Sequence, residues 1–171
     1  MNAREYNGTG LHSLVLRICT GWALLGGVVL LAVVGINLVS VIGASTIGYG
    51  FPGDFEMTEM GVAIAAFAFL PYCQIAGLNV TADIFTANAS RGLLAFFTLL
   101  AAIVALLFAG LLLWRMYLGL VDQRDYEYTT TILQVPVWWG FVPCLISLAL
   151  LILAAFATLV DAINDMTKRA H

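Results

Sequence analysis

The sequence predicts an all-α integral membrane protein with four transmembrane helices, and three observations lead to this prediction. Of the 171 residues, 62% are hydrophobic and only 10% are charged, whereas soluble domains contain about 25% charged residues. Stretches without any charged residue cover 18–53, 60–82, 92–114 and 128–160. Each stretch exceeds the roughly 20 apolar residues that a helix needs to cross the hydrocarbon core of a bilayer. A helix also satisfies its backbone hydrogen bonds within one segment, which lipid requires.

We expect the spans at about 18–42, 56–76, 92–120 and 136–160, forming a single membrane domain over residues 1–171. The first span carries Gly27, Gly35 and Gly43 at intervals of eight, along one ridge of the helix. The third span repeats alanine at every fourth position, at Ala101, Ala105 and Ala109. Small residues on such ridges let another helix approach closely, so both ridges are predicted packing faces.

The second span is predicted to begin with two carboxylates, Glu56 and Glu59, which share one helix face at a spacing of three. Glu59 is either a boundary residue with access to water or one side of a salt bridge with a partner subunit. The fourth span is predicted to open at Pro136, because a proline in the first turn lacks only a donor that would be unpaired anyway. Trp138 and Trp139 follow, as expected of aromatic side chains at the membrane interface.

Basic residues predict the orientation, because short cytoplasmic loops carry an excess of them. Two lie in the predicted third loop, Arg115 and Arg124, and five lie on the opposite side of the membrane, at Arg4, Arg17, Arg91, Lys168 and Arg169. Both termini are therefore predicted to be cytoplasmic, and six carboxylates, at Asp54, Glu56, Glu59, Asp122, Asp125 and Glu127, then lie at the outer face.

The composition argues against catalysis, cofactors and nucleic acid. Haem between spans commonly needs histidine ligands, and His12 and His171 both lie outside the predicted spans. We find no metal-ligand cluster and no catalytic constellation, and seven scattered basic residues do not form a nucleic-acid patch. Charges fall near the span ends, although a self-sufficient transporter usually has ionisable groups at mid-bilayer. Asn37 is the strongest polar candidate inside a span, and we expect it to bond another helix.

Three segments resemble the small membrane subunit, DctQ, of tripartite ATP-independent periplasmic (TRAP) transporters. Residues 53–60, Gly-Asp-Phe-Glu-Met-Thr-Glu-Met, are similar to the acidic start of that family's second helix. Residues 76–83, Ala-Gly-Leu-Asn-Val-Thr-Ala-Asp, resemble a family segment that usually has Gly-His and then Val-Asp, with Asn79 in place of the histidine. Residues 131–139 with Pro143 look like the family's Leu-x-Ile-Pro-x-Trp entry to the fourth helix.

The resemblance implies a scaffold subunit in the bacterial inner membrane that does not itself carry substrate. Its expected partners are a large multi-span subunit with the substrate and sodium sites, a periplasmic binding protein that delivers an organic acid such as a carboxylate or sialic acid, and membrane lipids. The candidate residues for subunit contact or docking are Gly27, Gly35, Asn37, Glu56, Glu59, Asp83, Arg91, Arg115, Pro136, Trp138, Trp139 and Pro143.

Two alternatives remain open at this stage. The chain could be a stand-alone oligomeric transporter that uses Glu59 and Asn37, in which case it would give flux by itself in liposomes. It could also be an accessory subunit of another membrane complex, which would give it a different co-purifying partner.

Overall fold

The computed structural model describes residues 10–78 and 91–168, and within them it is helical almost throughout. The helices are α1 (Gly10–Ile47), α2 (Asp54–Ile75), α4 (Arg91–Asp125) and α5 (Trp138–Lys168). All four are long and apolar enough to cross a membrane. The predicted fold class, an all-α protein with four membrane-spanning helices, is therefore confirmed.

Helix boundaries differ from the predicted spans where helical structure continues beyond the apolar stretch. Helix α1 already begins at Gly10, and α4 continues to Asp125. We predicted Pro136 in the first turn of α5, but α5 begins only at Trp138. Pro136 instead forms an antiparallel bridge with Thr129, and its carbonyl accepts a hydrogen bond from the Trp139 N–H at 3.1 Å.

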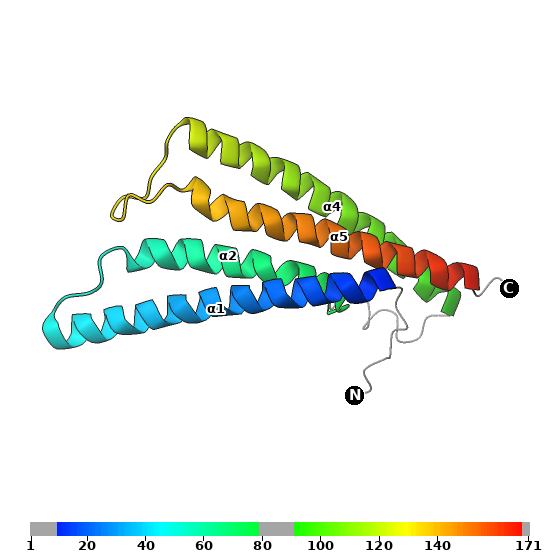
Figure 1. The fold of residues 1–171 in the computed structure, drawn as a ribbon, viewed down its shortest axis with the longest axis horizontal. Coiled ribbons are helices and arrows are strands. Elements are labelled where there is room, and N and C mark those ends of the chain that lie inside the picture. Colours follow the sequence, from blue (N-terminus) through cyan, green and yellow to red (C-terminus); the bar gives the residue numbers. More distant parts are fainter. Residues whose placement is uncertain (1–9, 79–90, 169–171) are drawn as a thin grey trace.

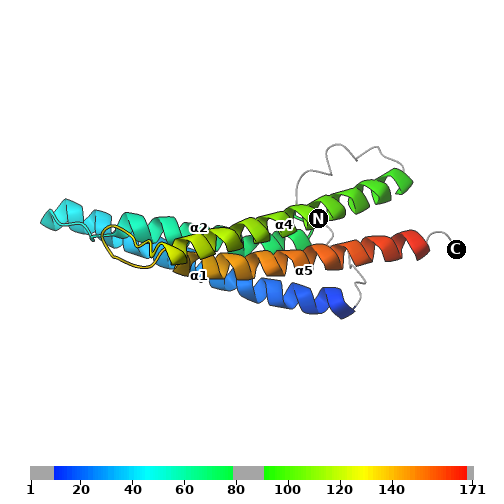
Figure 2. The same ribbon diagram turned by 90° about the horizontal axis from the view of Figure 1, so that it is seen from above.

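Helix α5 has the most helix neighbours. It packs against α1, α2 and α4, whereas α1 packs mainly on α2 and α4 mainly on α5. Figure 1 shows the helices side by side in the order α4, α5, α2, α1. Figure 2, turned by 90°, shows that they share one long axis. Large apolar side chains cover the outward surfaces of α1 and α4, including Leu31, Val39, Leu107 and Leu111.

Small residues form close contacts between helices, and only some of them are the ones that the sequence predicted. A side chain on Gly26 would meet the Cβ of Ala68 at 2.6 Å, and one on Gly61 would collide with Val33. In contrast, Gly27 and Gly35 have open space where a Cβ would lie. Gly27 and Gly35 therefore contact no other helix within the described residues, where Gly26 forms the contact instead, whereas Gly43, the third glycine of the predicted ridge, lies against the Tyr49 carbonyl. The predicted role of Gly27 and Gly35 at a subunit interface stays a prediction.

Helix α4 confirms part of the predicted alanine face. Ala109 is fully buried and Ala105 is half-buried, as predicted, but Ala101 is exposed and its neighbour Ala102 is buried instead. The predicted face is therefore correct at one end of the alanine repeat and displaced by one residue at the other.

The bundle has a hairpin end and a terminal end. The hairpin end holds the turn between α1 and α2 and the loop over residues 126–137. The terminal end holds the beginning of α1, the end of α2 and the last turns of α5.

Candidate functional site

Polar side chains join α1 to the start of α2 at the hairpin end. Ser40, which is buried, donates its hydroxyl to the Asp54 carboxylate and accepts a hydrogen bond from the Phe51 N–H at 3.1 Å. Asp54 also accepts from the Phe55 N–H at 2.7 Å. A carboxylate in the first turn of a helix interacts favourably with the unpaired N–H groups there. One serine in an apolar stretch therefore fixes where the chain turns and where α2 begins.

Asn37 adds a second link between these two helices. Its side-chain amide donates to Thr58 Oγ1 at 2.6 Å and to the Val33 carbonyl at 2.9 Å. Thr58 in turn donates to the Asp54 carbonyl at 2.7 Å. This is the interhelical bond that the sequence led us to expect of Asn37, and it uses the amide's donors inside the chain.

The 126–137 loop folds as a short hairpin. Thr130 N–H donates to the Val135 carbonyl and Val137 N–H to the Tyr128 carbonyl, both at 3.0 Å. Gln134 adopts a positive φ of 53° near the tip, a conformation that non-glycine residues seldom take. The loop thus has a defined shape, although residues 126–137 contain no regular β-strand.

Glu56 attaches this hairpin to α2. Its two carboxylate oxygens accept the Ile132 N–H at 2.7 Å and the Leu133 N–H at 3.0 Å. The Leu133 side chain lies against Gly53, whose φ of 84° requires the left-handed conformation that glycine takes without strain. Glu56 therefore acts as a clamp on residues distant in sequence, a role that its position in the helix could not reveal.

A groove of about 490 Å³ opens beside Glu56, between α2, α5 and the end of α4. Its rim is polar, formed by Glu56, Glu59, Thr130 and Thr131. Its walls are apolar and come from Phe55, Met60, Ala63, Phe67, Met116, Val137, Gly140, Phe141 and Cys144. Glu56 and Glu59 share this groove, as expected of two residues on one helix face.

The predicted aromatic and proline residues of α5 lie at or near its first turns. Trp138 and Trp139 pack edge to face, with ring centroids 6.1 Å apart, and Trp139 is exposed. Pro143 lies inside the helix, and its carbonyl accepts the Ser147 hydroxyl at 2.8 Å. Trp22 of α1 donates its indole N–H to Ser147 at 2.8 Å. This bond joins α1 to α5 and was not predicted.

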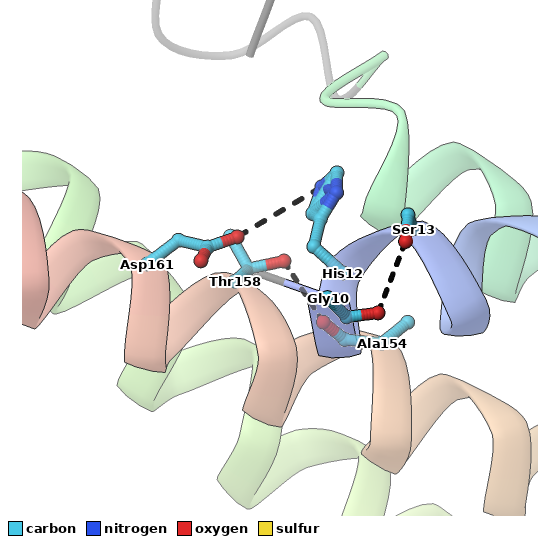
Figure 3. Close-up of polar contacts among 6 residues, drawn as sticks. All are labelled: Gly10, His12, Ser13, Ala154, Thr158 and Asp161. Carbon is cyan, nitrogen blue, oxygen red and sulfur yellow. Dashed lines mark hydrogen bonds and ion pairs between the residues drawn. The ribbon is translucent and has the colours of Figure 1, made fainter. Parts of the chain in front are cut away.

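The terminal end is organised around a small apolar cluster. Val15 and Cys19 of α1 meet Ile75 of α2 and Ala154 and Ala157 of α5. Beside this cluster, His12 Nε2 lies 4.0 Å from Asp161 Oδ2 (Figure 3). Both side chains are largely buried, with 15% and 9% of their surfaces exposed. His12 precedes the first predicted span and Asp161 follows the fourth, so both belong to the side of the termini, but the sequence gave no signal that they meet.

Three further candidate residues are either exposed or lie, in whole or in part, outside the described residues. Arg115 is exposed on α4, next to the exposed Trp114. Arg91 is the first residue of α4, and its side chain is outside the described part of the structure. Asp83 lies outside the described residues altogether.

Comparison with known families supplies the remaining observation. The family described as "Tripartite ATP-independent periplasmic transporters, DctQ component" matches residues 33–165, which is most of the chain. The chain belongs to the DctQ family. The resemblance seen in three segments is thereby confirmed, and the chain is a small component of a TRAP transporter and a multi-pass membrane protein. Neither the curated proteins nor the solved structures contain a match.

The match also covers the features just described. It begins at Val33 and therefore includes Asn37, Ser40, the acidic start of α2 and the whole 126–137 hairpin. His12, at the beginning of α1, lies before the matched region.

Proposed function

We propose that this chain is the static scaffold subunit of a sodium-coupled TRAP transporter for organic acids in the bacterial inner membrane. In this role it supports a large multi-span subunit that binds substrate and sodium. The observation that carries the proposal is that the helix contacts of the chain are filled by small and apolar side chains, with the polar groups among them bonded to one another.

The packing between helices leaves little polar surface for a substrate. Ala65, Ala68, Leu148, Ala154 and Ala155 are almost fully buried. An ionisable group in the membrane interior is usually part of a transport path. Here the carboxylates and basic residues of the described spans lie toward the helix ends. This distribution of charge favours the role of a scaffold over that of a stand-alone transporter.

The polar groups between the helices are bonded to one another. Asn37 bonds Thr58, and Trp22 bonds Ser147. Hydrogen bonds of this kind between membrane helices stabilise the pair by roughly 0.6–2 kcal/mol. Each therefore acts within the bundle, and Asn37 is better explained by packing than by transport.

The outward surfaces support contact with a larger partner. Helix α4 packs mainly on α5, so most of its apolar surface faces away from the bundle. Gly27 and Gly35 on α1 have open space beside them, which would allow a helix of another subunit to approach closely. We assign the contact with the large subunit to these faces.

We place the hairpin end in the periplasm and both termini in the cytoplasm, following the basic residues. The exposed carboxylates Asp122, Asp125 and Glu127 and the exposed rings of Tyr126 and Tyr128 then face the binding protein. The hairpin, with Arg115, Trp138 and Trp139 nearby, would help that protein to dock.

The first test is purification of the tagged chain from its native membrane in mild detergent, with mass spectrometry of its companions. We expect a stoichiometric larger multi-span protein. Liposomes that contain both proteins should take up an organic acid only with the binding protein and an inward sodium gradient. Flux through the chain alone, or recovery with copies of itself only, would contradict the scaffold role.

A matched pair of variants tests the proposed subunit face. Gly35→Leu should reduce recovery of the large subunit while leaving the melting temperature of the chain unchanged, because no other described residue lies within 4 Å of the position that a Cβ would take at Gly35. Ala66→Leu, at an exposed position of α2 outside the two proposed faces, is the control. Equal recovery with both variants would remove Gly35 from the interface.

A further inference from the structure

We propose that the groove between α2 and α5 binds one phospholipid whose headgroup carries a primary ammonium. The acyl chain lies along the apolar walls, and the ammonium pairs with Glu59. This inference concerns a lipid site that the scaffold role does not require.

The groove has the dimensions of one bilayer leaflet. Its wall on α2 runs from Phe55 to Phe67, which at 1.5 Å per residue is about 18 Å. Half of the roughly 30 Å hydrocarbon core is about 15 Å. The polar rim lies at one end of this length and the apolar walls fill the rest, which is how a phospholipid distributes its own polarity.

The volume favours a lipid over a helix. At about 490 Å³, the groove falls in the range of roughly 300–1,000 Å³ that is usual for ligand sites. A helix with its side chains is about 10–12 Å wide, so an equal length of helix would need a much larger space. A flexible acyl chain can follow the surface between Met60, Ala63 and Phe141.

The charge at the rim selects the headgroup. Glu56 is already occupied by two backbone N–H groups of the hairpin. Glu59 lies one turn further along α2, is exposed, and has no hydrogen bond or ion pair within the described residues. A carboxylate close to hydrocarbon is stabilised by a nearby cation. The Thr131 hydroxyl at the same rim can donate to the lipid phosphate.

An anionic headgroup such as phosphatidylglycerol lacks a cation for Glu59 and would be repelled by both carboxylates. A phosphatidylethanolamine headgroup offers the ammonium to Glu59 and the phosphate to Thr131. The groove should therefore distinguish these two lipids when their acyl chains are identical.

Native mass spectrometry of the full chain tests the proposal directly. Dioleoyl phosphatidylethanolamine and dioleoyl phosphatidylglycerol are added separately to delipidated protein, and bound lipid is counted. We expect the wild type to prefer phosphatidylethanolamine. In Glu59→Gln this preference should fall by about fivefold, the value of one charge pair near the membrane surface.

Two further variants separate the groove from general surface effects. Ala63→Phe fills the apolar wall and should reduce binding of phosphatidylethanolamine without removing Glu59. Asp122→Asn removes a carboxylate that is exposed at the same end of the bundle but outside the groove, and should behave as the wild type. Unchanged melting temperatures show that the variants are folded.

Equal binding of the two lipids by the wild type overturns the proposal, as does an unchanged preference in Glu59→Gln. Carbodiimide cross-linking in native membranes gives a third answer. A cross-link from Glu59 to a lysine of another protein would mean that a partner subunit, and not a lipid, provides the cation. The lipid-binding results do not bear on whether the chain co-purifies with a large transport subunit, so the two proposals can fail separately.

Discussion

The two ends of the bundle are held together in different ways. At the hairpin end, directed hydrogen bonds join helices and loops that are separated in sequence, with Ser40 and Asn37 as donors and the Asp54 and Glu56 carboxylates as acceptors. At the terminal end, Ala154 and Ala157 pack against Val15 and Cys19, with His12 and Asp161 beside them. One end thus depends on the directions of polar groups, and the other depends on the sizes of side chains.

This difference follows from the surroundings that each end must provide. Loops have backbone N–H groups that no helix satisfies, so a fixed loop needs side-chain acceptors such as Glu56. Continuous helices satisfy their own backbone, and their contact is limited only by how closely they can approach. Substitutions should therefore have effects of different kinds at the two ends.

The largest effect should come from enlarging a side chain at the terminal end. Ala154 is fully buried in the cluster with Val15 and Cys19, so Ala154→Leu should destabilise the bundle by about 1–3 kcal/mol through overpacking. Thermal unfolding of the purified chain in detergent measures this loss. Ala149→Leu, at an exposed position of the same helix, is the control and should change little. Equal midpoints for the two variants would show that close packing does not hold this end.

The interhelical bond of Asn37 should give the next largest effect. Asn37→Leu removes the bond to Thr58 and should cost roughly 0.6–2 kcal/mol. Combining it with Thr58→Val in a double-mutant cycle isolates the coupling between the two side chains. Strictly additive losses would mean that the pair contributes nothing as a pair.

Removal of the Glu56 charge should have a local effect. Glu56→Gln weakens the acceptors of the Ile132 and Leu133 N–H groups, so these two amides should exchange hydrogen for deuterium faster, while the helix cores remain protected. Hydrogen-exchange mass spectrometry resolves the two regions. Glu59→Gln provides the comparison, because Glu59 does not bond the hairpin. Unchanged exchange at the hairpin tip in Glu56→Gln would contradict the clamp.

The smallest effect should come from the His12–Asp161 pair at the terminal end. His12 Nε2 and Asp161 Oδ2 lie 4.0 Å apart, beyond the range of a good hydrogen bond. His12→Gln keeps a polar side chain beside Asp161 and should therefore shift stability by about 1 kcal/mol or less, below the effect of Ala154→Leu. A shift as large as that of Ala154→Leu would reverse the comparison and make polar interactions dominant at both ends.

The sequence predicted the features that depend on chemical composition along the chain. Four long apolar stretches were enough to predict four helices. Asn37 could be recognised because an amide in an apolar helix needs a partner, and Glu56 and Glu59 because their spacing places them on one face. These inferences require only the helical repeat and the cost of burying a polar group.

Features that depend on the position of a second helix could not be predicted. Gly26 and Gly27 are adjacent glycines, and only the location of Ala68 makes Gly26 a contact residue while Gly27 has open space beside it. The same holds for Ala101 and Ala102. Glu56 meets the hairpin, and Trp22 meets Ser147, through contacts between residues more than 70 positions apart. Pro136 was predicted in the first turn of α5, but it pairs with Thr129 in the hairpin and lies before the helix.

The position of α5 has a consequence for the order in which the protein is made. The ribosome synthesises α5 after α1, α2 and α4, yet α5 is the helix that all three contact. Until α5 enters the membrane, α1 and α2 can pair, but α4 lacks its main neighbour and the hairpin that Glu56 binds is tethered at only one of its two ends. Chains interrupted before Trp138 would therefore expose an unpaired apolar helix, which should make them substrates for membrane proteases.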